Sequence, residues 1–357
     1  MSDIRMRVDR DDRLVFEHDG ATVAEYVFLP TEPQVESPRP YFSPLRTLGG
    51  RDITSFRPSD HVWHKGLSLA LPVVDDENFW GGPSYVRESG YVQLPNNGSQ
   101  VHRDFSLSAG DGDGAGDGAA SITETLDWVT QHGALVLAEQ RRLSAHVVDD
   151  DAWLLIVETS LRNVTPRTLS IGSPTTRGRA DAGYGGLFWR GPLSFGGGTG
   201  LVHAASGSGQ GSDLGGSSSS GDDLRGTRDA WMSFSGRHDE VADGEVTDGE
   251  VTDDDAVDDG AAAEWSTVVM VDSPQNPGHP TEWFVRSEEY ACLCPAPFFS
   301  AEVELAAGET LTLSYAVVIA DGPADRDRAA ALAAAGQRGL DAATRSPVTP
   351  FVHGGHS

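Results

Sequence analysis

Apolar and polar residues alternate along most of this chain, and the alternation limits the folds open to it more than any other feature. The clearest run lies at 311–319, where every second residue is large and apolar: Leu311, Leu313, Tyr315, Val317 and Ile319. A period of two places such side chains on one face of a β-strand. Shorter runs of this kind, separated by turn-forming residues, lie at 4–29, 67–74, 122–128, 135–148, 153–164 and 265–271. The sequence therefore predicts a mainly β protein, a large antiparallel β-sandwich.

Four segments interrupt the alternating pattern. Three insertions are too rich in Gly, Ser and Asp to bury apolar area of their own, and they lie near 109–120, 206–223 and 239–263. We expect these insertions to be disordered loops between strands. The alanine-rich stretch 323–345 predicts a short C-terminal helix, followed by a flexible tail over 346–357. The chain is thus expected to hold a single β-sandwich domain over 1–322.

The charge balance excludes several classes of partner. The chain has 54 acidic and 26 basic residues and a formal net charge of -28. Such a surface repels nucleic acid and anionic lipid, so we expect neither nucleic acid nor a membrane as partner. The composition is typical of proteins that stay soluble in concentrated salt, where screening shortens charge repulsion to about 3 Å at ~1 M. We therefore expect a halophilic protein with a small-molecule ligand, and the sequence leaves its oligomeric state open.

The sequence also bears on localisation. It contains no run of about 18 apolar residues, and the charged stretch 1–13 lacks the apolar region of a signal peptide. The two cysteines, Cys292 and Cys294, are separated by one residue, a spacing that suits neither a disulfide nor a zinc site. We therefore predict a reduced, cytoplasmic protein.

The densest group of reactive side chains is the heptad 60–66, which contains Asp60, His61, Trp63, His64 and the only lysine, Lys65. On a strand, residues three apart point to opposite faces, whereas on one helical turn they are neighbours. Pro58 precedes the heptad and Gly66 ends it, and both favour a tight turn with the two imidazoles on one side. The two rings could then act as acid–base groups or bind one divalent metal. The alternative is that backbone carbonyls satisfy both rings in a buried loop.

Two later segments combine aromatic and basic residues with glycine or proline. In the glycine-rich block 173–192 these residues are Arg177, Tyr184, Trp189 and Arg190. In the proline-framed stretch 272–286 they are His279, Trp283 and Arg286. Aromatic rings stack on sugars, arginines bind carboxylates, and a rigid loop can hold a histidine in place. The alternative is that the aromatic residues fill the core and the arginines lie on the surface.

Two further candidates come from single positions. Glu139 and Arg141 are two residues apart on a predicted strand and therefore share one face. They form either a surface ion pair, which the pattern favours, or a carboxylate and a guanidinium that line a cleft. Tyr41 follows Arg39 and Pro40 in a proline-rich loop that leads toward the heptad, and we include it as a candidate ligand contact.

Several of these motifs together resemble a known family. They are Arg39-Pro-Tyr, Asp60-His-x-x-His-x-Gly, the pair Phe79-Trp80, Gly183-Tyr-Gly-Gly-Leu-Phe-Trp-Arg and His279-Pro-x-x-Trp-Phe-Val-Arg. The combination, spread over 39–320, resembles the PmoA-like family, which is often labelled "methane oxygenase". Members commonly carry His-His-Arg-Gly where this chain has Trp63-His64-Lys65-Gly66. This difference argues against three clustered histidines within the heptad.

The resemblance implies a soluble protein associated with sugar breakdown, and a sandwich similar to the galactose-mutarotase-like supersandwich of the aldose epimerases. It does not imply a membrane oxygenase subunit, because the chain lacks the apolar spans that such a subunit needs. The site that the resemblance suggests brings histidines and aromatic residues to one cleft of the sandwich.

We derive three hypotheses for function from these features. The first is a carbohydrate-active enzyme, such as a hydrolase, lyase or epimerase, that acts on a sugar or an oxidised sugar derivative. The second is a non-catalytic carbohydrate-binding protein. The third is a non-haem metal oxygenase, as the family label suggests, with His61, His64 and Asp60 as ligands. The sequence does not determine the cofactor, and binding of one divalent metal by His61 and His64 is an open alternative.

For the first hypothesis, the predicted catalytic residues are His61, His64 and His279. The predicted substrate-binding residues are Tyr41, Trp63, Lys65, Glu139, Arg177, Tyr184, Trp189, Arg190, Trp283 and Arg286.

Overall fold

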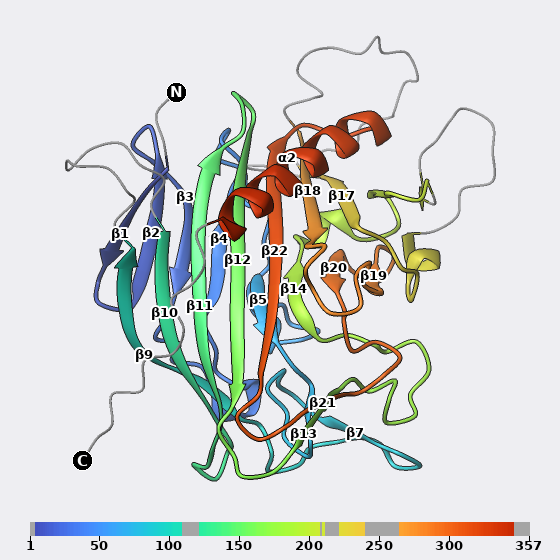
Figure 1. Ribbon diagram of the computed structural model, residues 1–357. Coiled ribbons are helices and arrows are strands. Elements are labelled where there is room, and N and C mark those ends of the chain that lie inside the picture. Colours follow the sequence, from blue (N-terminus) through green and yellow to red (C-terminus); the bar gives the residue numbers. More distant parts are fainter. Residues whose placement is uncertain (1–3, 109–120, 208, 211–220, 240–263, 346–357) are drawn as a thin grey trace.

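Two large antiparallel sheets dominate the computed structural model, which describes residues 4–108, 121–207, 209–210, 221–239 and 264–345 (Figure 1). Three predicted segments, the insertions at 109–120 and 240–263 and the tail at 346–357, lie outside the described residues. The mainly β prediction is confirmed, because two facing antiparallel sheets and one C-terminal helix make up the fold.

The first sheet has eight strands, and its outer face carries the candidate functional site. Its order is β1 (Arg5–Asp9), β2 (Arg13–His18), β3 (Ala21–Val27), β4 (Tyr41–Leu45), β5 (Leu67–Ala70), β14 (Gly186–Arg190), β20 (Cys292–Pro295) and β19 (Trp283–Arg286). The first five strands follow the chain, and the last three come from distant segments. Residues that are far apart in sequence therefore meet at the β5–β14–β20–β19 end of this sheet.

The second sheet has nine strands and contains the longest runs of alternation. Its order is β16 (Gly209–Gln210), β15 (Leu201–Ala204), β17 (Trp231–Arg237), β18 (Trp265–Asp272), β22 (Thr310–Asp321), β12 (Ala152–Asn163), β11 (Leu135–Val147), β10 (Ser121–Val129) and β9 (Ser99–Ser108). Strand β22 contains the run 311–319 and pairs with β12 along one edge and with β18 along the other. Because both edges are paired, β22 lies in the interior of the sheet.

Smaller elements close the ends of the sandwich. A three-stranded sheet joins β21 (Val303–Leu305), β13 (Leu169–Gly172) and β6 (Val73–Val74), and a hairpin joins β7 (Ser84–Val86) and β8 (Gly90–Val92). Three short 3-10 helices are η1 (Gln34–Glu36), η2 (Leu193–Phe195) and η3 (Gly221–Leu224). Strand β16 lies within the predicted insertion 206–223 and η3 begins within it, whereas 208 and 211–220 lie outside the described residues.

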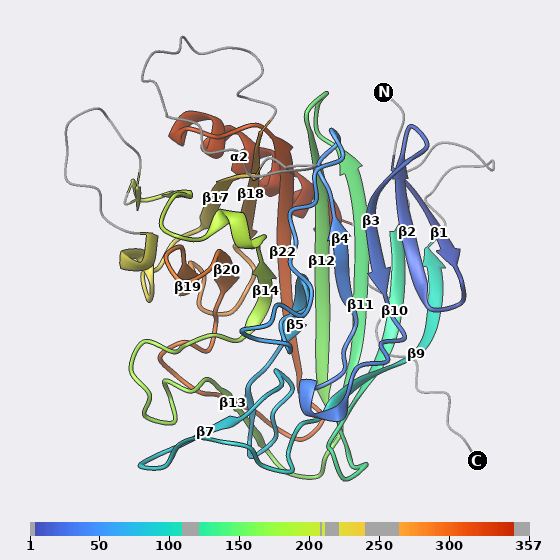
Figure 2. The same ribbon diagram turned by 180° about the vertical axis from the view of Figure 1, so that it is seen from behind.

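The main core fills the space between the two sheets, where apolar side chains of every second strand position pack together. A second core lies on the outer face of the nine-stranded sheet, under helix α2 (Arg326–Thr344), which Figure 2 shows from the opposite side. The helix begins where the Asp325 carboxylate accepts a hydrogen bond from the Arg328 amide. The helix predicted over 323–345 is confirmed. No helix within the described residues is long and apolar enough to cross a membrane.

Candidate functional site

A third group of buried aromatic and sulfur-containing side chains lies on the outer face of the eight-stranded sheet. Strand β14 buries Leu187 and Trp189 in the inter-sheet core and turns Phe188 outward. Strand β19 does the same with Trp283 inside and Phe284 outside. Because alternation continues to the strand ends, Arg190 and Arg286 also belong to the outer face. Several loops cover this face, and they carry the candidate residues.

The heptad 60–66 crosses this outer face as two consecutive turns. The His61 amide donates to the Pro58 carbonyl at 3.0 Å, and the His64 amide donates to the His61 carbonyl at 2.9 Å. The two imidazoles stack with centroids 4.6 Å apart and planes 6° from parallel. The heptad ends at Gly66, whose φ is +59° and where a Cβ would lie 2.3 Å from the Phe42 carbonyl oxygen. The predicted turn with both imidazoles on one side is confirmed.

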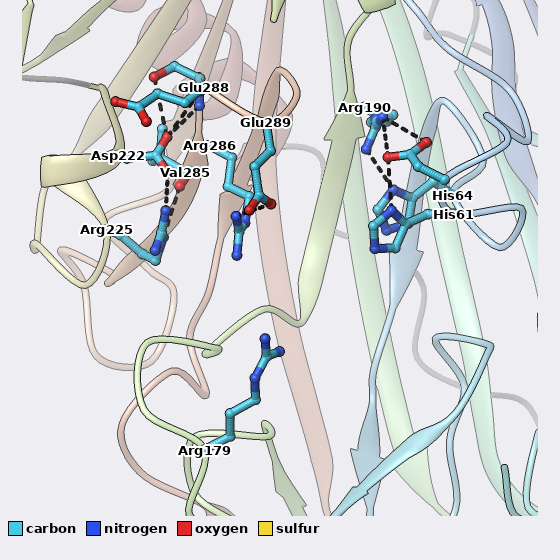
Figure 3. A network of polar contacts seen from close by, with 12 residues as sticks. His61, His64, Arg179, Arg190, Asp222, Arg225, Val285, Arg286, Glu288 and Glu289 are labelled. Atoms are coloured by element: carbon cyan, nitrogen blue, oxygen red, sulfur yellow. Dashed lines mark hydrogen bonds and ion pairs between the residues drawn. The ribbon is translucent and has the colours of Figure 1, made fainter. Parts of the chain in front are cut away.

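Asp60 and Arg190 connect the two imidazoles into one polar cluster. The Asp60 carboxylate accepts from His61 Nδ1 at 2.9 Å and from Arg190 Nη2 at 2.9 and 3.1 Å. Arg190 Nη1 lies 3.3 Å from His64 Nδ1. Partial burial raises the pKa of Asp60, but the hydrogen bonds from His61 and Arg190 outweigh it and hold the pKa below its usual value. We call Asp60, His61, His64 and Arg190 the histidine site (Figure 3).

The two histidines of this site differ in environment and therefore in chemistry. His64 is 2% exposed, and burial followed by the nearby His61 and Arg190 charges lowers its pKa well below the usual value. Neutral His64 can accept the Arg190 donor at Nδ1, which leaves the proton on Nε2. The His61 side chain is 35% exposed, and its Nδ1–H donates to Asp60, so its Nε2 is an acceptor. His61 thus presents a basic nitrogen, and the buried His64 ring stacks against the His61 ring.

Tyr290 lies at the centre of this part of the face. Its ring is 3.8 Å from the Arg190 guanidinium and 5.5 Å from that of Arg286. The same ring lies 5.5 Å from His61 and 5.7 Å from His64. One aromatic side chain therefore holds two guanidinium groups and two imidazoles together. Sequence reasoning missed Tyr290, because nothing in its local sequence separates it from a core tyrosine.

Aromatic contacts continue from the histidine site around the outer face. Trp80 lies 5.8 Å from His64 and 4.6 Å from Tyr184, and Tyr184 lies 5.5 Å from Phe284. Phe284 lies 5.7 Å from the guanidinium of Arg286, and the same guanidinium lies 5.5 Å from the Tyr290 ring. The contacts form a closed ring of side chains above β14 and β20. Trp63, which is half-buried, packs edge-on against His61 at 5.3 Å and adds a further ring.

Further arginines face the same region in Figure 3, where Arg179, Arg225 and Arg286 lie with the histidine site in one view. Arg225 and Arg286 each lie 5.7 Å from the Phe284 ring. Arg286 pairs with Glu289, and Arg225 pairs with Asp222. Within the described residues, the buried Nε atoms of Arg190 and Arg286 have no hydrogen-bond partner. In a strongly acidic protein, this concentration of guanidinium groups favours an anionic ligand.

A polar cavity of about 490 Å³ adjoins the ring of side chains. It shares Trp80 and Tyr184 with the ring, and its lining also includes Asp75, Asp76, Glu77, Val86 and Arg177. Arg177 donates to the Asp75 carbonyl at 2.9 Å and pairs with Glu302 at 3.4 Å. Neither histidine lines this cavity, so it is not the predicted histidine-containing cleft.

His279 does not join the other two histidines. Its Nδ1 lies 2.8 Å from the carboxylate of Asp272, a residue at the end of β18 in the nine-stranded sheet. Asp272 also accepts from the Asn276 side chain at 2.8 Å and from the Thr281 amide at 3.1 Å. His279 therefore anchors its own proline-framed loop. The predicted meeting of three histidines is not found among the described residues, because Asp272 of the nine-stranded sheet holds His279 in the loop between β18 and β19.

The histidine site does not fit a metal ion. An ion that binds an imidazole lies in the plane of that ring, and two stacked rings 6° from parallel share no such position. Arg190 also places a positive charge 3.3 Å from His64 Nδ1. In the part of the chain that the structure describes, no three His, Cys, Asp or Glu side chains converge as metal ligands. The arrangement therefore argues against His61 and His64 as a metal site, and against the oxygenase hypothesis.

Five predicted substrate-binding residues are buried and bonded to other protein groups. Trp189 and Trp283 are fully buried between the sheets, and their indole N–H groups donate to the carbonyls of Ile53 and Asp229 at 2.9 and 2.8 Å. Strand alternation puts their neighbours, not them, on the site face. Lys65 is fully buried and pairs with Glu36. These positions cannot contact a ligand at the histidine site.

Glu139 and Tyr41 are also corrected by the structure. Glu139 is fully buried and pairs with Arg141 between the sheets, so the predicted surface ion pair is wrong. Tyr41 is 7% exposed, stacks on Phe56 at 4.8 Å and donates to Glu32 at 3.1 Å. In contrast, Trp63, Tyr184, Arg190 and Arg286 lie at the outer face, and their role in substrate binding stays a prediction. Counting the register of β14 and β19 from their buried tryptophans would have found Phe188 and Phe284 as well.

Comparison with known proteins places this chain in a family without giving a function. A profile described as "Family of unknown function (DUF6807)" matches residues 13–334. No curated protein matches the chain. Among solved structures, a TPR-domain containing protein from Parabacteroides distasonis ATCC 8503 is similar, with 10% identity and a TM-score of 0.32. The match covers 88% of this chain and 46% of that one, so this chain spans less than half of that protein's length. A similarity this weak supports no conclusion about function.

Proposed function

The chain belongs to DUF6807, a family of unknown function, and from the outer-face site we propose that it is an enzyme that performs acid–base chemistry on a sugar acid. The observation that carries this proposal is the hydrogen bond between Asp60 and the part-exposed His61, beside a buried, neutral His64. A carboxylate that holds Nδ1–H of an imidazole leaves Nε2 free to accept a proton. This arrangement serves catalysis better than simple binding, which needs no basic nitrogen.

Each residue of the histidine site has a distinct role in this proposal. His61 acts as the general base, and Asp60 orients its ring and stabilises the imidazolium after proton transfer. Arg190 fixes Asp60 through two hydrogen bonds and lies over Tyr290. His64 is a positioning residue that stacks against His61 without adding charge. The abstracted proton would come from a carbon next to the substrate's carboxylate or from a hydroxyl group.

The same face supports a sugar acid as the substrate class. Trp63 and Tyr184 are half-buried aromatic side chains, and such rings pack against the apolar faces of sugar rings. Arg286 and Arg179 offer guanidinium groups that suit a carboxylate. A neutral sugar would make no use of the Arg179 charge, which among the described residues has only the Tyr91 hydroxyl as a side-chain partner, while a polyanion would be repelled by the net charge of -28. A small ligand with a single carboxylate suits both conditions.

Non-catalytic binding of sugar acids is the second candidate function. The aromatic residues and arginines of the outer face would serve it equally well. It differs from the first in one respect, because binding alone does not need the Nε2 acceptor of His61. Substitution of His61 therefore separates the two functions.

The test is a panel of uronic and aldonic acids incubated with the protein in deuterated buffer at high salt. Solvent exchange and product formation are followed by NMR. We expect exchange or turnover of at least one acid, and a loss of about 100-fold or more in His61→Ala. His18→Ala, which changes a part-buried histidine at the end of β2, far along the eight-stranded sheet from β14, is the matched control. Binding of an acid without exchange or turnover, unchanged in His61→Ala, would overturn catalysis in favour of the binding function.

A further inference from the structure

We propose that the natural ligand is an acidic disaccharide, with its carboxylate at the arginines of the outer face and an uncharged sugar unit in the adjoining cavity. This inference rests on the proposed sugar-acid function and extends it from one sugar unit to two. It starts from the cavity of about 490 Å³, which exceeds the space that a contact point for one functional group requires.

The cavity and the histidine site share one aromatic wall. Trp80 lines the cavity and lies 5.8 Å from the His64 ring. Tyr184 also lines the cavity, packs against Trp80 at 4.6 Å and contacts Phe284 on the outer face. The two regions are therefore one side chain apart. A ligand that is longer than one sugar unit can reach both, whereas a monosaccharide cannot.

Arg179 lies at the boundary between the two regions. Its guanidinium lies 4.6 Å from the Tyr91 ring, and the Tyr91 hydroxyl is 2.9 Å from that of Tyr184. In Figure 3 the Arg179 side chain extends from its loop toward the part of the outer face that carries Arg286. A positive group at this position can pair with an acidic unit on the outer face.

The cavity has more carboxylates than guanidinium groups in its lining, which disfavours an acidic sugar unit there. It is lined by Asp75, Asp76 and Glu77 together with Arg87 and Arg177. The Oε2 atom of Glu77 is buried and has no hydrogen-bond partner within the described residues. Burial raises the pKa of Glu77, as does the neighbouring Asp76, although His132 opposes the shift. Sugar hydroxyl groups would satisfy such acceptors, whereas a second carboxylate there would be repelled.

The test compares binding of gluconate, cellobionate and digalacturonate by titration calorimetry at constant salt. Cellobionate carries one carboxylate and one neutral glucose unit, while digalacturonate carries a carboxylate on each unit. We expect cellobionate to bind at least 10-fold more tightly than both of the others. Equal affinity for gluconate and cellobionate would overturn the proposal, because the cavity would then contribute nothing.

Two variants examine the cavity itself. Val86→Trp fills the cavity from β7, and Val92→Trp is the matched control on the paired strand β8, at a position that does not line the cavity. We expect Val86→Trp to lose about 10-fold in affinity for cellobionate and to bind gluconate unchanged. Glu77→Gln should bind digalacturonate several-fold more tightly than the wild type does. If Val86→Trp leaves cellobionate binding intact, the cavity is not the second subsite.

These outcomes are distinguishable from failure of the proposed enzyme. Calorimetry measures binding whether or not the ligand is turned over. A preference for cellobionate without turnover would keep the disaccharide site and overturn catalysis. Turnover of a monosaccharide acid without any preference for cellobionate would do the reverse.

Discussion

Two clusters of acidic, histidine and arginine side chains lie on opposite faces of the eight-stranded sheet, and they serve different ends. The histidine site occupies the outer face. The other cluster, which we call the inter-sheet cluster, lies between the sheets and consists of Tyr26, His102, Glu124, Glu139 and Arg141. Both pair a histidine with a carboxylate at 2.8 to 2.9 Å. Composition alone does not distinguish them.

The inter-sheet cluster is buried except for His102, whose side chain is 14% exposed, and its members bond to one another. Glu139 accepts from Arg141 at 2.8 and 2.9 Å, from Trp128 at 2.7 Å and from Thr159 at 2.8 Å. Tyr26 donates to Glu124 and accepts from Arg141 at 3.0 Å. Every partner of these charges is a protein group. A buried charge held in this way is a structural element.

The histidine site keeps part of its polar surface available. The side chains of Asp60 and His61 are 41% and 35% exposed, while Arg190 is 1% exposed. The Nε atom of Arg190 lacks a partner within the described residues. The comparison teaches that exposure and incomplete pairing, rather than residue types, separate the proposed ligand site from a cluster that holds the fold together.

The largest expected effect is loss of stability on breaking the inter-sheet cluster. Glu139→Gln leaves Arg141 buried with an incomplete partner and should lower the free energy of unfolding by about 3 to 5 kcal/mol. Asp60→Asn, the matched change at the histidine site, should cost about 1 kcal/mol or less because Asp60 is exposed. Urea unfolding in high salt measures both. Equal losses in the two variants would remove the distinction between a closed and an open cluster.

A smaller effect is expected from removing one hydroxyl group in each region. Tyr26→Phe removes one buried hydrogen-bond partner from Glu124 and one from Arg141, and should cost about 1 to 3 kcal/mol. Tyr290→Phe should cost less than about 0.5 kcal/mol, since within the described residues the Tyr290 hydroxyl forms no hydrogen bond. Thermal and urea unfolding of the two variants test this difference. A larger loss in Tyr290→Phe than in Tyr26→Phe would contradict it.

The smallest expected effect is a pH dependence that arises from His64. Its folded pKa lies well below its unfolded value of about 6.5, so the unfolded chain binds a proton that the folded protein excludes. Stability from this group is therefore lost as pH falls below about 6.5, at about 1.4 kcal/mol per pH unit. His64→Gln should remove this component. The check is the difference between wild type and variant in urea unfolding at pH 7.5 and 5.5, and an unchanged difference would exclude it.

Sequence reasoning succeeded where local spacing decides geometry. The alternating runs predicted the sheets, and the alanine-rich stretch predicted α2. The short spacing of His61 and His64 between Pro58 and Gly66 predicted that both rings would face the same side. Each of these features depends on residues within a few positions of one another.

Sequence reasoning failed where the answer depended on which sheet a segment joins. Trp189 and Trp283 were expected at the site, but one step of strand register places them in the core and gives the outer face to Phe188 and Phe284. His279 was expected beside His61, but its loop is held by Asp272 of the other sheet. Glu139 and Arg141 were expected at the surface, because a pair two residues apart carries no sign of the sheet that covers it.

The sequence by itself determined the strand periodicity, the terminal helix, the acidic character and the turn that stacks His61 on His64. All of these follow from interactions between near neighbours in the chain. Only the tertiary structure decided that Asp60 and Arg190 meet across 130 residues, that Tyr290 contacts Arg190 and both histidines, and that a polar cavity lies next to this group. Such contacts depend on strand order and on the side of the sheet that faces solvent, and strand order arises from pairing between distant segments.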